Sequence, residues 1–274
     1  MLLRIISALI PLPFILWLIW TGGWPFAALI LVVAGICLYE AAAMTVPGDR
    51  VAAVVLMIAG LGLVLAVLTG AFMHPIGAAV PALLFVGLLL FFLFRPGELE
   101  TAHHRMGGAV LALCWGGLLV AMIGVLSRLP EGGAWVLLAC VLSWGSDTGA
   151  YFAGRFLGKK KLYEKVSPKK TWAGAVGGVL SATAMAYVFW RFLGPSTLPL
   201  PALLLLSPIG AALGQLGDLA ESLLKRAAGV KDSGKIMPGH GGLLDRIDAL
   251  VFVAPWLLSY AVGILGLPLT WLTL

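Results

Sequence analysis

The chain has 274 residues, of which 61% are hydrophobic and only 11% are charged, and its formal net charge is +6. An ordinary soluble domain carries about 25% charged residues, so this composition excludes that class and indicates an integral membrane protein with several spans. The three cysteines are scattered through apolar runs, which indicates neither a disulfide framework nor a zinc site.

Nine apolar segments are long enough to cross a membrane, which takes about 20 helical residues. They cover approximately residues 4–21, 25–45, 51–70, 77–94, 107–127, 134–154, 172–192, 202–225 and 248–271. We interpret the first segment as a retained helix and not as a secretory signal, because no small-residue cleavage site follows it. The sequence thus predicts an all-α, polytopic membrane protein with a single membrane domain over residues 1–274.

The basic residues predict the orientation of this domain. With a cytoplasmic N-terminus, only Arg128 and Arg191 fall outside, which leaves 16 of the 18 basic residues inside. We therefore expect the C-terminus outside and both long polar loops, 155–171 and 226–247, on the cytoplasmic face of the cell (inner) membrane. No nucleic-acid-reading module accompanies the basic residues, so an anionic cytoplasmic ligand or a lipid headgroup is the favoured partner, and nucleic acid is not.

The eighth predicted helix carries a polar face. At 100° per residue, Gln215, Asp218, Glu221, Ser222 and Lys225 fall within an arc of about 120°. A charge at the centre of a bilayer costs on the order of 2.5–3.5 kcal/mol, so this face is expected to line a protein interior or a wet cavity. Glu221 and Lys225 are four residues apart and are also compatible with a purely structural salt bridge. Asp218 has no basic residue at such a spacing.

Two further stretches supply polar groups near the same cytoplasmic end. In the sixth predicted helix Asp147 shares one face with Tyr151. The segment 167–171 combines the hydroxyls of Ser167 and Thr171 with two lysines just before a helix, where free backbone N–H groups also favour anions. We expect both stretches to share a cavity with residues 217–248, although ordinary positive-inside charge also explains lysines in this loop.

The ninth predicted helix begins with Asp245 and Asp248, about 60° apart, after a flexible glycine-rich turn that contains His240. Asp245 and Asp218 come from neighbouring helices of opposite direction, so their carboxylates are expected to meet. Carboxylates without Cys or His partners suit Mg²⁺, which usually binds one or two of them together with substrate phosphates. The pattern indicates phosphoryl or nucleotidyl transfer. Glu40, within the second helix, is expected to be buried and hydrogen-bonded.

These residues also resemble a known family signature. The runs SLLKR at 222–226, KDSG at 231–234 and PGHGGLLDRID at 238–248 are similar to the signature of the phosphatidate cytidylyltransferases, the CDP-diacylglycerol synthases. The runs at 147–151 and 166–172 and the Gly-Asp pair at 217–218 are similar as well. Met237 and Ala173 depart from the pattern, and we assign no role to Ala173.

The resemblance implies a reaction in which CTP and phosphatidate give CDP-diacylglycerol and pyrophosphate with Mg²⁺. It implies metal binding by Asp218 and Asp245, with Lys225 as a third catalytic residue, and makes Asp147 and Asp248 candidates for a second cation. The candidate substrate-binding residues are Ser167, Lys169, Lys170, Thr171, Ser222, Arg226, Lys231, His240 and Arg246. Residues 107–274 would form the catalytic half and residues 1–106 an N-terminal helical bundle.

Two other functions are compatible with intramembrane acids. A transporter or channel would use them to carry ions, but the charge here gathers at one membrane face, which favours an enzyme. A CDP-alcohol phosphotransferase would carry the motif D-G-x-x-A-R followed by G-x-x-x-D-x-x-x-D, which is absent. A homodimer is compatible with the sequence.

Overall fold

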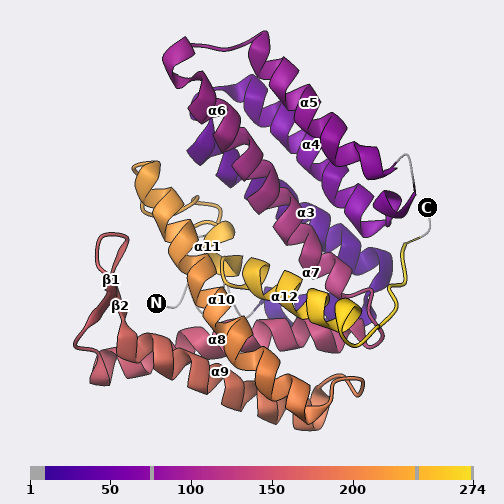
Figure 1. Ribbon diagram of the computed structural model, residues 1–274, viewed down its shortest axis with the longest axis vertical. Coiled ribbons are helices and arrows are strands. Elements are labelled where there is room, and N and C mark those ends of the chain that lie inside the picture. The colour runs from indigo at the N-terminus through magenta and orange to yellow at the C-terminus, as the bar shows by residue number, and fades with distance from the viewer. Residues whose placement is uncertain (1–9, 75–76, 238–240, 273–274) are drawn as a thin grey trace.

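A computed structural model describes residues 10–74, 77–237 and 241–272, and these residues are mostly helical (Figure 1). The longer helices are α2 (Pro11–Thr21), α3 (Gly23–Thr45), α4 (Arg50–Leu68), α5 (Val80–Leu93), α6 (Leu99–Ala112), α7 (Val120–Leu126), α8 (Gly132–Leu157), α9 (Trp172–Leu193), α10 (Leu200–Ala227) and α12 (Leu250–Gly263). Short elements are the 3₁₀ turns η1 (Ala71–Met73) and η2 (Gly77–Ala79), the π-helical η3 (Leu113–Leu119) and α11 (Leu244–Ile247).

Six helical runs are long and apolar enough to cross a membrane: Gly23–Thr45, Arg50–Leu68, Leu99–Leu126, Gly132–Leu157, Trp172–Leu193 and Leu200–Ala227. Three more apolar helices, Pro11–Thr21, Gly77–Leu93 and Leu250–Gly263, are shorter. The prediction of an all-α membrane protein with several spans is confirmed at this level. The count of nine spans and the orientation of the termini stay predictions.

The prediction of an irregular loop over residues 155–171 is wrong in detail, because these residues include a helix end and two strands. α8 continues to Leu157, and the chain then forms an antiparallel hairpin of β1 (Lys161–Tyr163) and β2 (Ser167–Thr171). The amine of Lys161 donates to the carbonyl oxygen of Pro168 at 2.6 Å, and Val166 is only 2% exposed. Only Val166 and Thr171 are buried among residues 161–171, so no alternating apolar pattern predicted the two strands.

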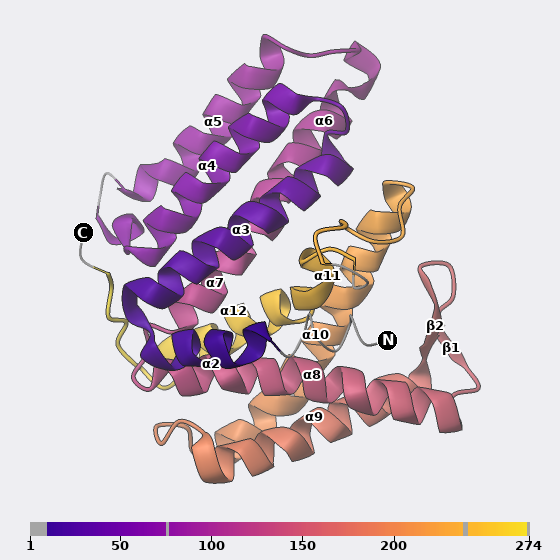
Figure 2. The same ribbon diagram turned by 180° about the vertical axis from the view of Figure 1, so that it is seen from behind.

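The helices form two groups that cross each other. α3, α4, α5 and the α6–α7 run lie alongside one another, whereas α8 and α9 lie side by side across one end of this bundle (Figures 1 and 2). The α6–α7 run passes through residue 106, so the proposed division between residues 106 and 107 falls inside a helix. The division itself stays a prediction.

Small residues set the distance between α8 and α9. A methyl group added at Gly177 of α9 would overlap the side chain of Ala153 on α8, and one at Gly149 would lie 2.7 Å from the carbonyl oxygen of Gly177. Glycine therefore lets the two backbones approach closely, as is common between helices in membranes. This seam fixes the positions of Asp147 on α8 and of the hairpin that leads into α9.

Asp49 joins two turns at one end of the N-terminal bundle. Its carboxylate accepts a hydrogen bond from the backbone N–H of Ala52 at 2.9 Å, caps α4, and pairs with Arg105 and, at 3.5 Å, with Arg95. The hydrogen bond from Ala52, together with both guanidinium groups, holds the pKa of Asp49 below its ordinary value despite some burial. The turns before α4 and before α6 therefore lie at the same end of the N-terminal bundle.

Substitution Gly177→Ala is expected to lower the free energy of unfolding by about 1–3 kcal/mol, because the added methyl group forces α8 and α9 apart. The matched control is Gly87→Ala in α5, where nothing lies within 4 Å of an added methyl group. This control is expected to be neutral or to gain up to about 1 kcal/mol from helix propensity. Thermal unfolding in detergent measures both, and equal melting temperatures would contradict the tight seam.

Candidate active site

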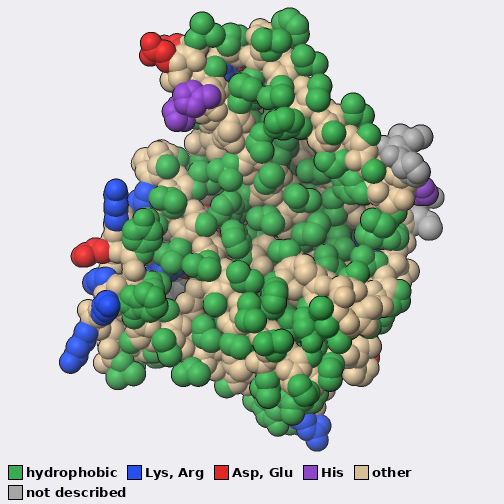
Figure 3. Space-filling view, in the orientation of Figure 1, with side chains coloured by type: hydrophobic (Ala, Val, Ile, Leu, Met, Phe, Trp, Pro, Cys, Tyr) green, Lys and Arg blue, Asp and Glu red, His purple; other side chains and the backbone are tan. Residues whose placement is uncertain are grey.

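A cavity of about 420 Å³ lies between α8, the β1–β2 hairpin, α9 and α10. Its charged lining residues are Asp147, Arg155, Lys169, Lys170 and Asp218. The structure thus brings Asp147 and the end of β2 together with the polar face of α10, as the sequence predicted. Figure 3 shows that basic side chains gather at the edge of the molecule near the hairpin, whereas apolar side chains cover most of the same view.

Asp218 is the acidic residue that α10 presents to this cavity. One carboxylate oxygen lies 2.6 Å from the amine of Lys170, and the hydroxyl of Ser222 donates to the other at 3.4 Å. The side chain of Asp218 is 29% exposed, whereas the amine nitrogen of Lys170 is itself buried, so of this pair the carboxylate is the more accessible to a ligand in the cavity. A carboxylate and an ammonium group therefore face the same space.

Further negative charge lies close to Asp218. The charges of Asp147, Asp218 and Asp248 act on one another, and Arg246 acts on Asp147. No group of three or more His, Cys, Asp or Glu side chains that could hold a metal occurs among the described residues. Two carboxylates lining one cavity nevertheless fit Mg²⁺, because this ion commonly takes only one or two carboxylates and completes its shell with phosphates and water.

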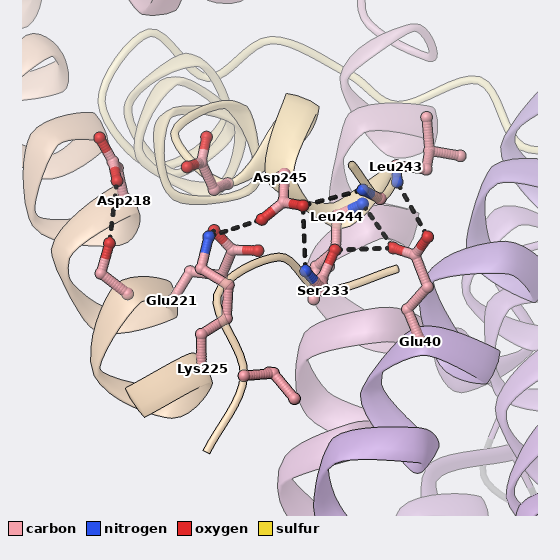
Figure 4. A network of polar contacts seen from close by, with 12 residues as sticks. Glu40, Asp218, Glu221, Lys225, Ser233, Leu243, Leu244 and Asp245 are labelled. Atoms are coloured by element: carbon pink, nitrogen blue, oxygen red, sulfur yellow. Dashed lines mark hydrogen bonds and ion pairs between the residues drawn. The ribbon is translucent and has the colours of Figure 1, made fainter. Parts of the chain in front are cut away.

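Asp245 belongs to a different cluster (Figure 4). One of its oxygens accepts from the amine of Lys225 at 2.5 Å, and the other accepts from the backbone N–H groups of Ser233 at 3.0 Å and Gly242 at 2.8 Å. Burial raises the pKa of Asp245, but these hydrogen bonds outweigh burial, so its pKa lies below its ordinary value. Within the described part of the chain, no interaction joins Asp245 to Asp218. The expected meeting of these two carboxylates is not formed here.

Lys225 connects α10 to α11. The predicted salt bridge between Lys225 and Glu221 is present at 2.7 Å, and the same amine also reaches Asp245. Glu221 is fully buried and Lys225 is only 8% exposed. One ammonium group thus contacts two carboxylates, one on α10 and one on α11, so its role goes beyond a bond within one helix.

Three other predicted site residues have structural partners. Thr171 caps α9, because its hydroxyl oxygen accepts from the N–H of Gly174 at 3.1 Å, although it also lines the cavity. Ser222 is buried and bonds to Asp218. Arg226 donates to the carbonyl oxygen of Val230 at 3.0 Å, just beyond the end of α10.

The remaining predicted residues lie away from the cavity lining or outside the described part. Ser167 begins β2 and is not a lining residue, and Lys231 and Arg246 are exposed. His240 lies outside the described residues. Their predicted roles in substrate binding stay predictions.

Two lining residues were missed as substrate-binding candidates. Arg155 and Tyr151 line the cavity, and the guanidinium of Arg155 donates to the Tyr151 hydroxyl at 2.9 Å. Tyr151 and Arg155 lie four and eight residues after Asp147, and residues at this spacing share one side of a helix. This spacing was the sequence signal that could have identified them. Gln215 also lines the cavity, and its amide donates to Ser146 at 2.9 Å and to the carbonyl oxygen of Ala175 at 3.0 Å. It therefore ties α8, α9 and α10 together.

An apolar groove of about 410 Å³ adjoins the cavity between α9 and α10. It shares Leu162, Ala175 and Gln215 with the cavity, and its other lining residues are Trp172, Val176, Val179, Leu180, Ala212, Leu216 and Leu219. A charged cavity thus continues into a hydrocarbon-like surface. This combination suits an amphiphile with an anionic head.

Known proteins give an independent comparison. A model of the cytidylyltransferase family matches residues 2–263. A protein of Brucella suis named phosphatidate cytidylyltransferase is 34% identical over 268 residues, which cover 92% of this chain and 89% of that protein. Proteins of the same name from Bacillus subtilis and Haemophilus influenzae are 42% and 44% identical over 154 and 131 residues. These matches cover 56% and 46% of this chain and 57% and 46% of the relatives, about half the length of each.

Substitution Lys225→Met is expected to destabilise the protein by about 3–5 kcal/mol, because it leaves the buried carboxylates of Glu221 and Asp245 without a counter-charge. The double variant Lys225→Met/Glu221→Gln removes one of those charges and is expected to regain part of the loss. Melting temperatures in detergent measure both variants, with exposed Lys165→Met as the control. A double variant no more stable than Lys225→Met would contradict the shared ammonium.

Proposed function

The chain belongs to the cytidylyltransferase family, and from this membership we propose that it is a phosphatidate cytidylyltransferase of phospholipid biosynthesis. The proposed reaction joins CTP and phosphatidate into CDP-diacylglycerol and releases pyrophosphate. The observation that carries the proposal is the charged cavity continuous with the apolar groove, because the substrates combine several phosphates with two hydrocarbon chains. The names of the relatives support the same reaction.

The cavity and the groove would bind different parts of phosphatidate. The phosphatidate headgroup would lie in the cavity beside Lys169, Lys170 and Arg155, and an acyl chain would lie in the groove against Ala212 and its neighbours. Phosphatidate would then approach sideways from the inner leaflet, and CTP would arrive from the cytoplasm. Thr171 would act from the cavity lining and Ser167 from the start of β2, whereas Lys225, Arg226 and the other predicted substrate-binding residues would act from segment 222–248.

The chemistry requires positioning more than acid–base catalysis. A phosphate oxygen of phosphatidate attacks the α-phosphorus of CTP, forming a new phosphoanhydride bond. The bond from the α-phosphorus to the oxygen that bridges it to the β-phosphorus breaks, and pyrophosphate leaves with that electron pair. The phosphate of phosphatidate is already ionised near neutral pH, so no strong base is needed. The ammonium groups of Lys169 and Lys170 would offset the charge of the phosphates and hold them in line.

We propose Mg²⁺ as the cofactor, held by Asp218 and Asp147 together with the substrate phosphates. When bound, Mg²⁺ supplies Lewis-acid neutralisation of the negative charge that grows on the phosphates. Asp245 keeps its predicted role as a ligand only if it exchanges Lys225 for the cation, since Lys225 lies 2.5 Å from it. A second cation beside Asp248 stays a prediction.

We also propose a multi-pass protein of the cell (inner) membrane, with nine spans, a cytoplasmic N-terminus, an external C-terminus and the active site on the cytoplasmic face. The distribution of basic residues supports this orientation, because 16 of 18 then lie inside. A homodimer stays a prediction.

Substitutions Asp218→Asn and Asp147→Asn are each expected to lower the rate by at least about 10²-fold, because each removes a charge that stabilises the transition state. The assay measures pyrophosphate released from CTP in dependence on added phosphatidate and Mg²⁺. Glu164→Gln, an exposed carboxylate of the hairpin outside the cavity lining, is the matched control and is expected to keep the wild-type rate. Folded Asp variants with full activity would overturn the assignment.

Substitution Ala212→Phe is expected to raise the KM for phosphatidate roughly tenfold without changing the KM for CTP. Filling the groove displaces about two methylene groups of an acyl chain, which costs about 1.6 kcal/mol, and 1.4 kcal/mol corresponds to a factor of ten. Leu205→Phe places the same ring on an exposed part of α10 outside the groove and serves as the control. Equal effects of both variants would contradict a chain-binding groove.

A further inference from the structure

Glu40 on α3 is a buried carboxylate whose hydrogen-bond partners, within the described residues, come from the far end of the chain. Its side chain accepts from the Ser233 hydroxyl at 3.0 Å, the Leu243 N–H at 3.0 Å and the Leu244 N–H at 2.9 Å (Figure 4). The residue is 1% exposed, and burial of a carboxylate is costly unless donors of this kind surround it. The predicted buried hydrogen bonding is therefore confirmed. The partners lie 193 to 204 positions away along the chain.

The segment around these partners closes tightly on Glu40. A methyl group added at Gly234 would overlap one oxygen of its carboxylate, and one at Gly242 would lie 2.6 Å from the other and overlap the Ser233 hydroxyl. Glycine at both positions lets the backbone lie directly against the carboxylate. Both ends of segment 233–244, whose described residues are 233–237 and 241–244, thus lie against a side chain supplied by the N-terminal bundle.

Glu40 and Asp245 share the donors of this segment. Ser233 donates its N–H to Asp245 and its hydroxyl to Glu40. Three consecutive N–H groups lead into α11: that of Gly242 goes to Asp245, and those of Leu243 and Leu244 go to Glu40. These backbone donors satisfy oxygens of both carboxylates, as burial of such groups requires. Asp245 in turn accepts from Lys225. The contacts therefore link Glu40 on α3, through Ser233 and Asp245, to Lys225 on α10.

We propose that Glu40 is a positioning residue of the active site, which holds the described ends of segment 233–244 so that Asp245 keeps its contact with Lys225 on α10, the helix that also carries Asp218. Glu40 is not a lining residue of the cavity, so it acts through Ser233 and Asp245 and not by touching substrate. The kinetic part of this inference rests on the proposed function. The structural part, that Glu40 anchors segment 233–244, does not.

The first experiment compares Glu40→Gln with Asp49→Asn. Glutamine keeps the size of the side chain but turns an NH₂ group toward backbone donors, so kcat is expected to fall about 10- to 100-fold, as is typical when outer-shell partners are lost. Both KM values are expected to stay near wild type. Asp49 is a carboxylate of the same bundle with ion-pair partners but no contact to segment 233–244, so Asp49→Asn is expected to lower the melting temperature and leave kcat unchanged. Equal loss of kcat in both variants at matched melting temperature would overturn the proposal.

The second experiment is limited trypsin digestion at the exposed residues Lys231 and Lys235, followed by mass spectrometry of the fragments. Glu40→Gln is expected to be cut faster there than the wild type or Asp49→Asn, because the segment loses its anchor. This measurement needs no turnover. If the wild type shows no CTP-dependent activity but Glu40→Gln is still cut faster than the wild type, the proposed function is refuted and the anchoring stands. If Glu40→Gln is cut no faster than the wild type, the anchoring is refuted.

Two milder variants keep the proposal testable if Glu40→Gln does not fold. Glu40→Asp retains the charge on a shorter stem and is expected to restore part of the kcat that Glu40→Gln loses. Ser233→Ala removes only the hydroxyl link and is expected to lower kcat and speed cutting at Lys235. Wild-type kcat and wild-type cutting in Ser233→Ala would contradict the relay through Ser233.

Discussion

The pairing of buried charge is the constraint on which the rest of this structure depends. Inside an apolar bundle a carboxylate must meet a cation, meet backbone donors or face water. The cluster around Asp245 meets the first two conditions, because Lys225 and the N–H groups of Ser233 and Gly242 surround it. Asp218 meets the first and the third, because it pairs with Lys170 and lines a cavity. The position of each acid in this region follows from one of these solutions.

The closed cluster and the open cavity have different properties as a result. The closed cluster joins α3, α10 and α11 through hydrogen bonds that leave Asp245 no free oxygen, so it is suited to hold a fixed geometry. In the open cavity the side chain of Asp218 is 29% exposed, so this carboxylate is accessible to a ligand. A rigid frame beside an accessible site is the arrangement that positioning catalysis requires.

The two helix groups contribute separately to this arrangement. The glycine seam between α8 and α9 brings Asp147 and the hairpin lysines to one wall of the cavity. The N-terminal bundle contributes through Glu40, although no other acid of that bundle contacts the segment 233–244 in the described residues. The bundle therefore does more than anchor the chain in the membrane. Through Glu40, α3 holds the backbone that leads to Asp245.

The sequence by itself determined where most of the long helices lie, because apolar runs of about 20 residues are local patterns. It also determined the polar face of α10, because helical spacing is local, and it predicted Asp147, residues 167–171 and Asp218 at one membrane face from the distribution of basic residues. Only the tertiary structure decided the partners: Lys170 for Asp218, Lys225 for Asp245 and the segment 233–244 for Glu40. Each of these contacts joins different elements, and which groups meet depends on helix packing that no local period records.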